Sequence, residues 1–150
     1  MATPSQPSFW AYLSSSDNNV TGDGSLYDII CDTVSYDNYS QYNSSTGVFT
    51  AAYPRMYEVS GVITVSGIGL LHSGVYFNLV TSGGTKRIFA LVPSSAVLSG
   101  LYTASFSRQI LFNTNETAYL QVVVTGSSKT VDVIGGTSPY TVEFGATLVS

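Results

Sequence analysis

The stretch at residues 42–57, YNSSTGVFTAAYPRMY, decides the fold. It begins with polar residues, reaches Thr46-Gly47, and then alternates apolar and small residues up to Pro54. Glycine adopts the positive φ of a tight turn without steric cost, and an alternation with period two is typical of a strand with one buried face. The stretch therefore predicts a turn at 46–47 that leads directly into a core strand, with Phe49 pointing inward.

The rest of the chain shows the same period of two, and no window of helical length keeps a period of 3.6. Strands are expected at 9–14, 26–34, 48–53, 56–71, 72–92, 101–112, 118–126 and 140–149, with the 72–92 segment folded into a hairpin at Ser82-Gly83-Gly84. The polar segments 14–25 and 35–47 are expected to be loops, and the loop at 125–139 is expected to hold a short extra strand at 131–134. This pattern predicts an all-β antiparallel sandwich or jelly roll with almost no helix. It forms a single domain at 8–150, after a flexible lead-in at 1–7.

Four segments resemble the globular heads of C1q-like proteins, and they occur in the same order. They are SFWAYLS at 8–14, the stretch from Tyr42 to Tyr57, NETAYLQV at 115–122 and TVEFGATLV at 141–149. The third segment has Asn115-Glu116 where the family has Gly-Asp, and asparagine also accepts a left-handed backbone conformation. The resemblance covers residues 8 to 149, nearly the whole chain.

The resemblance implies a C1q/TNF-like jelly roll of about ten strands in two sheets that assembles as a tight homotrimer. By family position, Tyr57 and Phe144 are expected near the threefold axis, with Phe106 on a strand between them in sequence. The alternative for each of the three is an ordinary place in the sandwich core.

Charge and composition exclude several function classes. Only 9% of the 150 residues are charged, the net charge is −4, and just five residues are Lys or Arg. Binding to nucleic acid or to an anionic membrane needs a basic surface, which this composition does not supply. No apolar run approaches the roughly 20 residues of a membrane span, and the first residues lack the basic and apolar regions of a signal peptide.

The residues that usually carry catalysis are scarce. His72 and Cys31 are the only histidine and cysteine, and nothing in the sequence brings them together. Asp28 and Asp32 would share a face of a strand simply because they are an even number of residues apart, so a solvated face explains them without catalysis. No Gly-x-Ser-x-Gly motif, which marks a nucleophilic serine, occurs in the sequence. Cys31 is expected to be a small buried apolar residue. The sequence therefore predicts that the protein is not an enzyme and uses no cofactor, apart from one candidate metal.

That candidate is Ca²⁺, because Asp17, Asp23 and Asp28 lie in and beside an oxygen-rich polar loop. The spacing matches no EF-hand. A solvated loop without metal is the alternative.

A second candidate site is the cluster Tyr36, Tyr39 and Tyr42, which lies in a segment rich in Ser, Asn and Gln. Binding surfaces often combine tyrosines with adaptable polar residues of this kind. The cluster is the predicted ligand-binding loop, for a sugar or a protein. The alternative is that Tyr42 holds the turn while the other two pack locally.

Two functions agree with these observations. The first is a noncatalytic homotrimeric head on the surface of a virus or phage, such as a spike, a fibre knob or a capsid decoration. It would contact other virion proteins and attach to a host protein or glycan. The second is a secreted, extracellular C1q-like recognition or signalling protein whose leader and stem have been removed.

Overall fold

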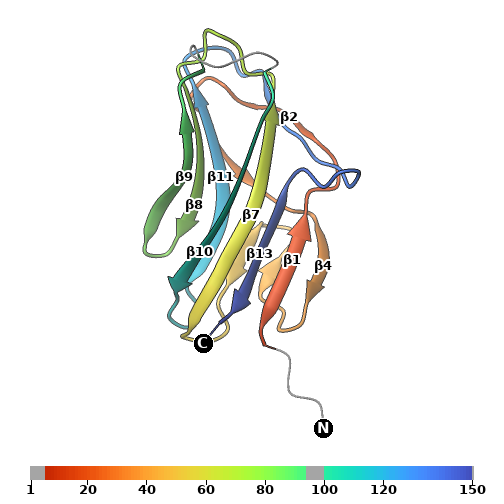
Figure 1. The fold of residues 1–150 in the computed structure, drawn as a ribbon, viewed down its shortest axis with the longest axis vertical. Helices are drawn as coiled ribbons and strands as arrows, with labels where there is room; N and C mark the ends of the chain where they lie inside the picture. The colour runs from red at the N-terminus through yellow and green to blue at the C-terminus, as the bar shows by residue number, and fades with distance from the viewer. Residues whose placement is uncertain (1–5, 94–99, 150) are drawn as a thin grey trace.

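The structure, a computed structural model, describes residues 6–93 and 100–149, and these residues form a β-sandwich (Figure 1). No α-helix occurs within those two ranges, so none there is long and apolar enough to cross a membrane. The strands are β1 (Ser8–Tyr12), β2 (Asp17–Thr21), β3 (Leu26–Ile29), β4 (Thr33–Asp37), β5 (Tyr42–Asn43), β6 (Val48–Thr50), β7 (Met56–Ser66), β8 (Gly74–Thr81), β9 (Gly84–Leu91), β10 (Tyr102–Leu111), β11 (Thr117–Thr125), β12 (Val131–Val133) and β13 (Glu143–Leu148).

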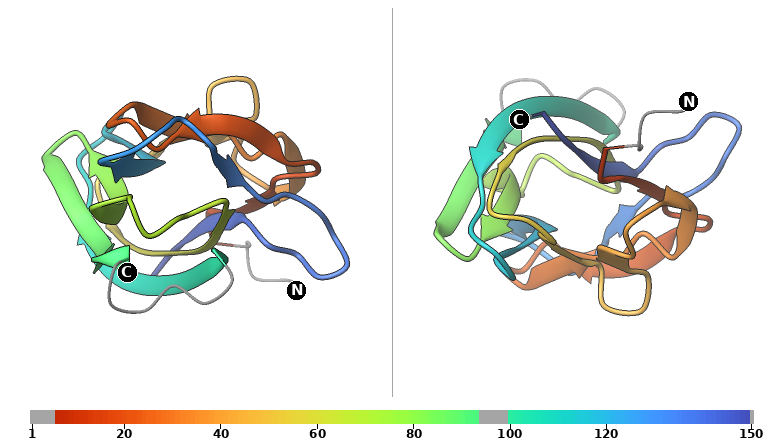
Figure 2. Two further views of the ribbon diagram at one scale, coloured as in Figure 1. Left: turned by 90° about the horizontal axis from the view of Figure 1, so that it is seen from above. Right: turned by 90° about the horizontal axis from the view of Figure 1, so that it is seen from below.

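The strands form two antiparallel sheets that face each other across the core (Figure 2). In the first sheet the order is β2-β12-β7-β13-β1-β4, and β10 pairs with β7. In the second the order is β5-β6-β11-β8-β9, and β3 pairs with β11. We call them the β7 sheet and the β11 sheet after their central strands. The prediction of an all-β antiparallel jelly roll is confirmed.

Two segments that were predicted to be loops, 14–25 and 35–47, contain strands. β2 lies in the predicted loop 14–25, and parts of β4 and β5 lie in the predicted loop 35–47. β2 is an edge strand that pairs only with β12, and its polar sequence DNNVT shows no apolar alternation. Polar side chains are typical of such edges, so period-two analysis does not detect them. The short extra strand expected at 131–134 is present as β12.

The turn at Thr46-Gly47 has the expected backbone geometry. Gly47 has a φ of 76°, and its N–H donates to the carbonyl oxygen of Asn43 at 2.8 Å. A Cβ on Gly47 would lie 2.8 Å from the carbonyl oxygen of Ile29, so the residue must also be small. Asn115 has a φ of 68°, so it replaces the glycine of the family turn as expected.

An aromatic cluster between the two sheets forms one end of the core. Phe9 stacks on Tyr42 at a centroid distance of 4.8 Å and on Phe49 at 5.2 Å. Phe49 in turn meets Tyr57 and Phe112 edge-on. Offset-stacked and edge-to-face pairs of this kind each add about 0.5–1.5 kcal/mol beyond the area they bury. The inward orientation predicted for Phe49 is confirmed.

Two of the residues predicted at the trimer interface, Tyr57 and Phe144, lie in this cluster. The side chains of Tyr57 and Phe144 are 0% and 1% exposed within a single chain. Both therefore lie in the sandwich core of a single chain, the place that was the alternative for each of them. Phe106, on β10, is partly exposed and covers Gly61 of β7.

The two ends of the described chain are held side by side. The N–H of Leu148 donates to the carbonyl oxygen of Pro7 at 2.9 Å, and β1 pairs with β13 along its whole length. The amide of Asn38 also donates to the carbonyl oxygen of Gln6. Residues 6 and 7 of the predicted lead-in are therefore attached to the sandwich, and the first five residues lie outside the described ranges.

Candidate functional site

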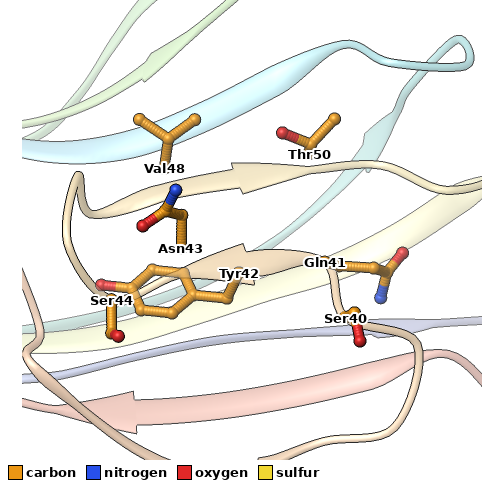
Figure 3. A pocket seen from close by; sticks show the side chains of 7 residues that line it. All are labelled: Ser40, Gln41, Tyr42, Asn43, Ser44, Val48 and Thr50. Carbon is orange, nitrogen blue, oxygen red and sulfur yellow. The ribbon is translucent and has the colours of Figure 1, made fainter.

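A surface pocket of about 430 Å³ lies along β5 and β6, at the edge of the β11 sheet (Figure 3). It is lined by Ser40, Gln41, Tyr42, Asn43, Ser44, Val48 and Thr50. None of these seven residues is charged, and most carry a hydroxyl or an amide. Such a surface suits the binding of a neutral, polar ligand, because hydroxyl and amide groups both donate and accept hydrogen bonds.

The loop that leads into the pocket is shaped by Asp37. Its two carboxylate oxygens accept hydrogen bonds from the N–H of Gln41 at 2.9 Å and of Tyr42 at 2.8 Å. Ser40, which lies between Asp37 and Gln41 in sequence, has a backbone in the left-handed region, with a φ of 52°. A non-glycine residue with positive φ is uncommon and is kept only where its surroundings require it. The carboxylate thus holds residues 38–41 in a tight, defined loop.

Gln41 is the buried polar residue of the pocket, with 4% of its side chain exposed. Its Oε1 accepts hydrogen bonds from the N–H of Ala52 at 3.1 Å and from the hydroxyl of Tyr57 at 2.8 Å. The backbone N–H can only donate, so this contact fixes which end of the amide is oxygen. The Nε2 group has no hydrogen-bond partner among the residues that the structure describes. Unpartnered donors are uncommon in buried positions, where each costs about 1–3 kcal/mol.

Two exposed tyrosines lie next to the pocket. Tyr39 immediately precedes Ser40 of the lining, and Tyr53 follows Ala52, which contacts Gln41. Their rings meet edge-on at a centroid distance of 5.9 Å, and both side chains are exposed. The pair therefore adds an aromatic surface beside the polar pocket.

The structure does not bring the three predicted tyrosines together. Tyr42 is buried, and its hydroxyl accepts from the N–H of Cys31 and donates to the carbonyl oxygen of the same residue, both at 3.0 Å. Burial is the main cause that raises the pKa of Tyr42 well above its ordinary value. Tyr36 is exposed, but it lies opposite Trp10 on the β7 sheet. Of the three, Tyr42 lines the pocket and Tyr39 is the exposed one that precedes the lining in sequence; its partner Tyr53 was not predicted.

The structure does not gather the three aspartates proposed for Ca²⁺ into one cluster. No group of three or more His, Cys, Asp or Glu side chains in the described part of the chain is placed to hold a metal ion. Asp17 accepts from the hydroxyl of Tyr27 at 2.5 Å, and Asp28 accepts from the amide of Gln121 at 3.2 Å. Asp23 accepts from the N–H and the hydroxyl of Ser25. Each carboxylate thus has its own partner, so the acidic loop is explained by local hydrogen bonds.

Cys31 is buried and unpaired, as expected of a small apolar residue. Burial raises the pKa of its thiol to about 12, so at neutral pH it carries almost no thiolate, the reactive form.

His72 is also buried, and both of its ring nitrogens are engaged. Its Nδ1 accepts from the N–H of Gly69 at 2.9 Å, which leaves the proton on Nε2, 3.1 Å from the carbonyl oxygen of Ser128. The imidazole therefore ties the loop after β7 to the loop after β11. These contacts give His72 a structural role.

No protein-family model matches the chain, and no curated protein is significantly similar to it in sequence. Solved structures do match. The globular domain of the zebrafish complement 1qA protein is 11% identical with a TM-score of 0.64, over 97% of this chain and 98% of that one. The Eiger TNF of S. frugiperda is 10% identical with a TM-score of 0.65, over 98% and 94%. Murine APRIL is 6% identical with a TM-score of 0.59, over 96% and 99%.

These matches cover nearly the full length of each protein. The chain therefore has a C1q/TNF-like jelly-roll fold, which confirms the resemblance seen in the sequence. At these identities the likeness shows the fold alone.

Proposed function

We propose that the protein is a noncatalytic homotrimeric binding head. The observation that carries the proposal is a pair of sheet edges, β9 and β10, which lie next to each other and are each paired with one strand only; we call these two strands the seam (Figure 2). Apolar side chains on both strands pack against the core but stay partly exposed: Ile88, Phe89, Leu91, Tyr102, Ala104 and Phe106. Partly exposed apolar side chains that gather on neighbouring strands are typical of an interaction surface.

Charge supports a contact between this seam and the outer face of the β7 sheet of another copy. Lys86 and Arg108 lie on the two seam strands, while the third basic residue there, Arg87, is engaged within the chain over the ring of Tyr76. The outer face of the β7 sheet carries Glu58 and Glu143, among serines and threonines. Because the seam and the face are different surfaces, the contact is head-to-tail, and three copies joined in this way form a ring when each is rotated by a third of a turn. Opposite charges on the two surfaces favour this orientation.

The noncatalytic part of the proposal follows from the engaged side chains described above. Cys31 and His72 both have structural contacts, and the pocket lining is uncharged. General acid–base catalysis needs an ionisable group within reach of the substrate, and the ionisable side chain of this lining, Tyr42, has its hydroxyl engaged by the backbone of Cys31.

For its location, we propose the surface of a virus or phage particle, where the head would contact other virion proteins and attach to a host protein or glycan. Support comes from a composition with few charges and many hydroxyl groups, which suits an assembled β-protein. A secreted, extracellular C1q-like recognition or signalling protein is the alternative. Neighbouring genes distinguish the two, because capsid genes support the first and collagen repeats upstream support the second.

The test of assembly is native mass spectrometry. A trimer has three times 15.9 kDa, about 48 kDa. Phe106→Ser, in the seam, should shift the mass towards that of the monomer. Leu26→Ser is the matched control, since Leu26 is an exposed apolar residue on β3 of the other sheet. Circular dichroism of both variants checks the fold. A wild-type monomer at micromolar concentration would overturn the proposal.

A further inference from the structure

We infer that the pocket on β5 and β6 binds a neutral sugar, with the Nε2 group of Gln41 donating a hydrogen bond to it. The inference names a ligand class and a site for the proposed binding function, and it does not depend on the trimer. It combines three features: an uncharged cavity, a buried donor without a partner, and an exposed aromatic pair beside them.

The first step concerns the size and chemistry of the cavity. A volume of about 430 Å³ lies in the range of small-molecule sites, roughly 300–1,000 Å³. Ser40, Asn43, Ser44 and Thr50 line it with hydroxyl and amide groups. A sugar carries hydroxyls all round its ring, and each hydroxyl can both donate and accept. Because no lining residue is charged, the cavity favours a neutral sugar over a charged one.

The second step concerns the donor that is left over. Both contacts of Gln41 within the protein use Oε1, so Nε2 remains without a partner in a side chain that is almost fully buried. Because this nitrogen has almost no accessible surface, the side chain of Gln41 has to turn towards the pocket before a hydroxyl or carbonyl oxygen of a ligand can satisfy it. Ser40 and Gln41 lie at one end of the row of lining side chains and Ser44 lies at the other, so a sugar at Gln41 would also be near the hydroxyl of Ser40 (Figure 3).

The third step concerns the aromatic pair. The C–H groups on one face of a pyranose ring make an apolar surface, which packs on the flat side of an aromatic ring. Tyr39 and Tyr53 offer such rings beside the pocket, and their edge-to-face contact holds them in place. Aromatic rings with polar tips combine a large contact area with a small loss of conformational entropy. A short peptide could also offer carbonyl oxygens to Gln41, but it would not explain the many hydroxyl partners in the lining.

The experiment is an NMR titration of the ¹⁵N-labelled protein with N-acetylglucosamine and glucose. The side-chain amide signal of Gln41 should shift in a saturable way, with a dissociation constant in the millimolar range. A dissociation constant of 1 mM corresponds to a binding free energy of about −4 kcal/mol. Sialic acid, the charged comparison, should bind more weakly. Triglycine serves as the peptide probe, and saturable shifts with triglycine but with neither sugar would overturn the inference.

Variants separate the site from unspecific effects. Tyr39→Ala and Asn43→Ala should each weaken sugar binding roughly tenfold, a change that corresponds to about 1.4 kcal/mol. Tyr140→Ala is the matched control, since Tyr140 is 48% exposed against 38% for Tyr39 and makes a similar edge-to-face pair with Tyr12. If Tyr39→Ala and Tyr140→Ala lowered the affinity for the sugar equally, the proposed location of the site would be wrong.

Gln41→Glu tests the donor itself. It keeps an oxygen for Ala52 and Tyr57 but removes the donating N–H group, so sugar binding should fall. If this variant does not fold, the exposed variants still decide the question.

Failure of this inference and failure of the proposed assembly can be told apart. A 48 kDa trimer that binds neither sugar leaves the trimer and removes the sugar site. A monomer whose Gln41 amide shifts on titration leaves the sugar site and removes the trimer.

Discussion

Replacing Tyr42 by phenylalanine tests how the aromatic core is linked to the loop before β4. The substitution keeps the ring that stacks on Phe9, with an interplanar angle of 9°, and removes only the hydroxyl. That hydroxyl contacts both the N–H and the carbonyl oxygen of Cys31 at 3.0 Å. Without it, a buried donor and a buried acceptor lose this partner, and each such loss costs about 1–3 kcal/mol. We expect Tyr42→Phe to lower the free energy of unfolding by about 2–6 kcal/mol.

The matched control is Tyr57→Phe, which also removes a buried hydroxyl. The hydroxyl of Tyr57 donates to Oε1 of Gln41, which keeps its hydrogen bond from Ala52 when the hydroxyl is gone. Since no donor is left behind and the acceptor stays partnered, the expected loss is about 1 kcal/mol. Urea unfolding followed by the fluorescence of Trp10, the only tryptophan, measures both variants at one protein concentration. A loss for Tyr42→Phe no larger than that for Tyr57→Phe would refute the reasoning.

Three further predictions concern other parts of the molecule. Burial opposes ionisation of Asp32, but hydrogen bonds from Ser14 and Thr33 outweigh it and lower its pKa. The carboxylate therefore stabilises the fold above its unfolded-state pKa, and this contribution disappears as the pH falls through the folded value. Asp32→Asn should thus lower the urea midpoint at neutral pH, but it should leave the midpoint unchanged at a pH below the pKa of Asp32 in the folded protein. An equally large decrease in the midpoint at the two pH values would contradict this reasoning. Gly145→Ala should cost about 1–3 kcal/mol and shift the emission of Trp10, because the new Cβ would lie 1.9 Å from Cε3 of the indole; unchanged emission and stability would show that the ring does not lie there. Ca²⁺ and EDTA should leave the thermal midpoint unchanged, since Asp17, Asp23 and Asp28 are separately engaged, and a rise with Ca²⁺ would reveal a site that the described residues do not form.

The parts of the fold that were predictable from the sequence are those set by local geometry. Gly47 and Asn115 have the positive φ values that their turns require, and that preference belongs to the residue itself. The alternation along β7 likewise identifies one buried face. Polar edge strands such as β2 could not be found this way, because Asn18 and Asn19 are polar and exposed at successive positions and interrupt the alternation.

The site depends on contacts between distant segments, and this limits prediction. The alternation along a strand shows that Tyr57 and Val59 lie on the same face. It does not show whether that face packs on the other sheet or on a second copy. Gln41 gives no signal in the sequence, since its role depends on Ala52 and Tyr57, 11 and 16 residues further along. Tyr39 was predicted because tyrosines cluster in the polar segment, but its pairing with Tyr53 is decided by the fold.

The pairing of β1 with β13 means that the chain enters and leaves the sandwich at the same end, where Pro7 contacts Leu148. The loops at 22–24, 67–73 and 126–130 lie at the opposite end (Figure 1). A support joined to either terminus would therefore leave that far end free. A short linker could join the termini and allow new ends to be opened elsewhere. A protein built in this way can be displayed, fused or circularly permuted while its two sheets keep their registers.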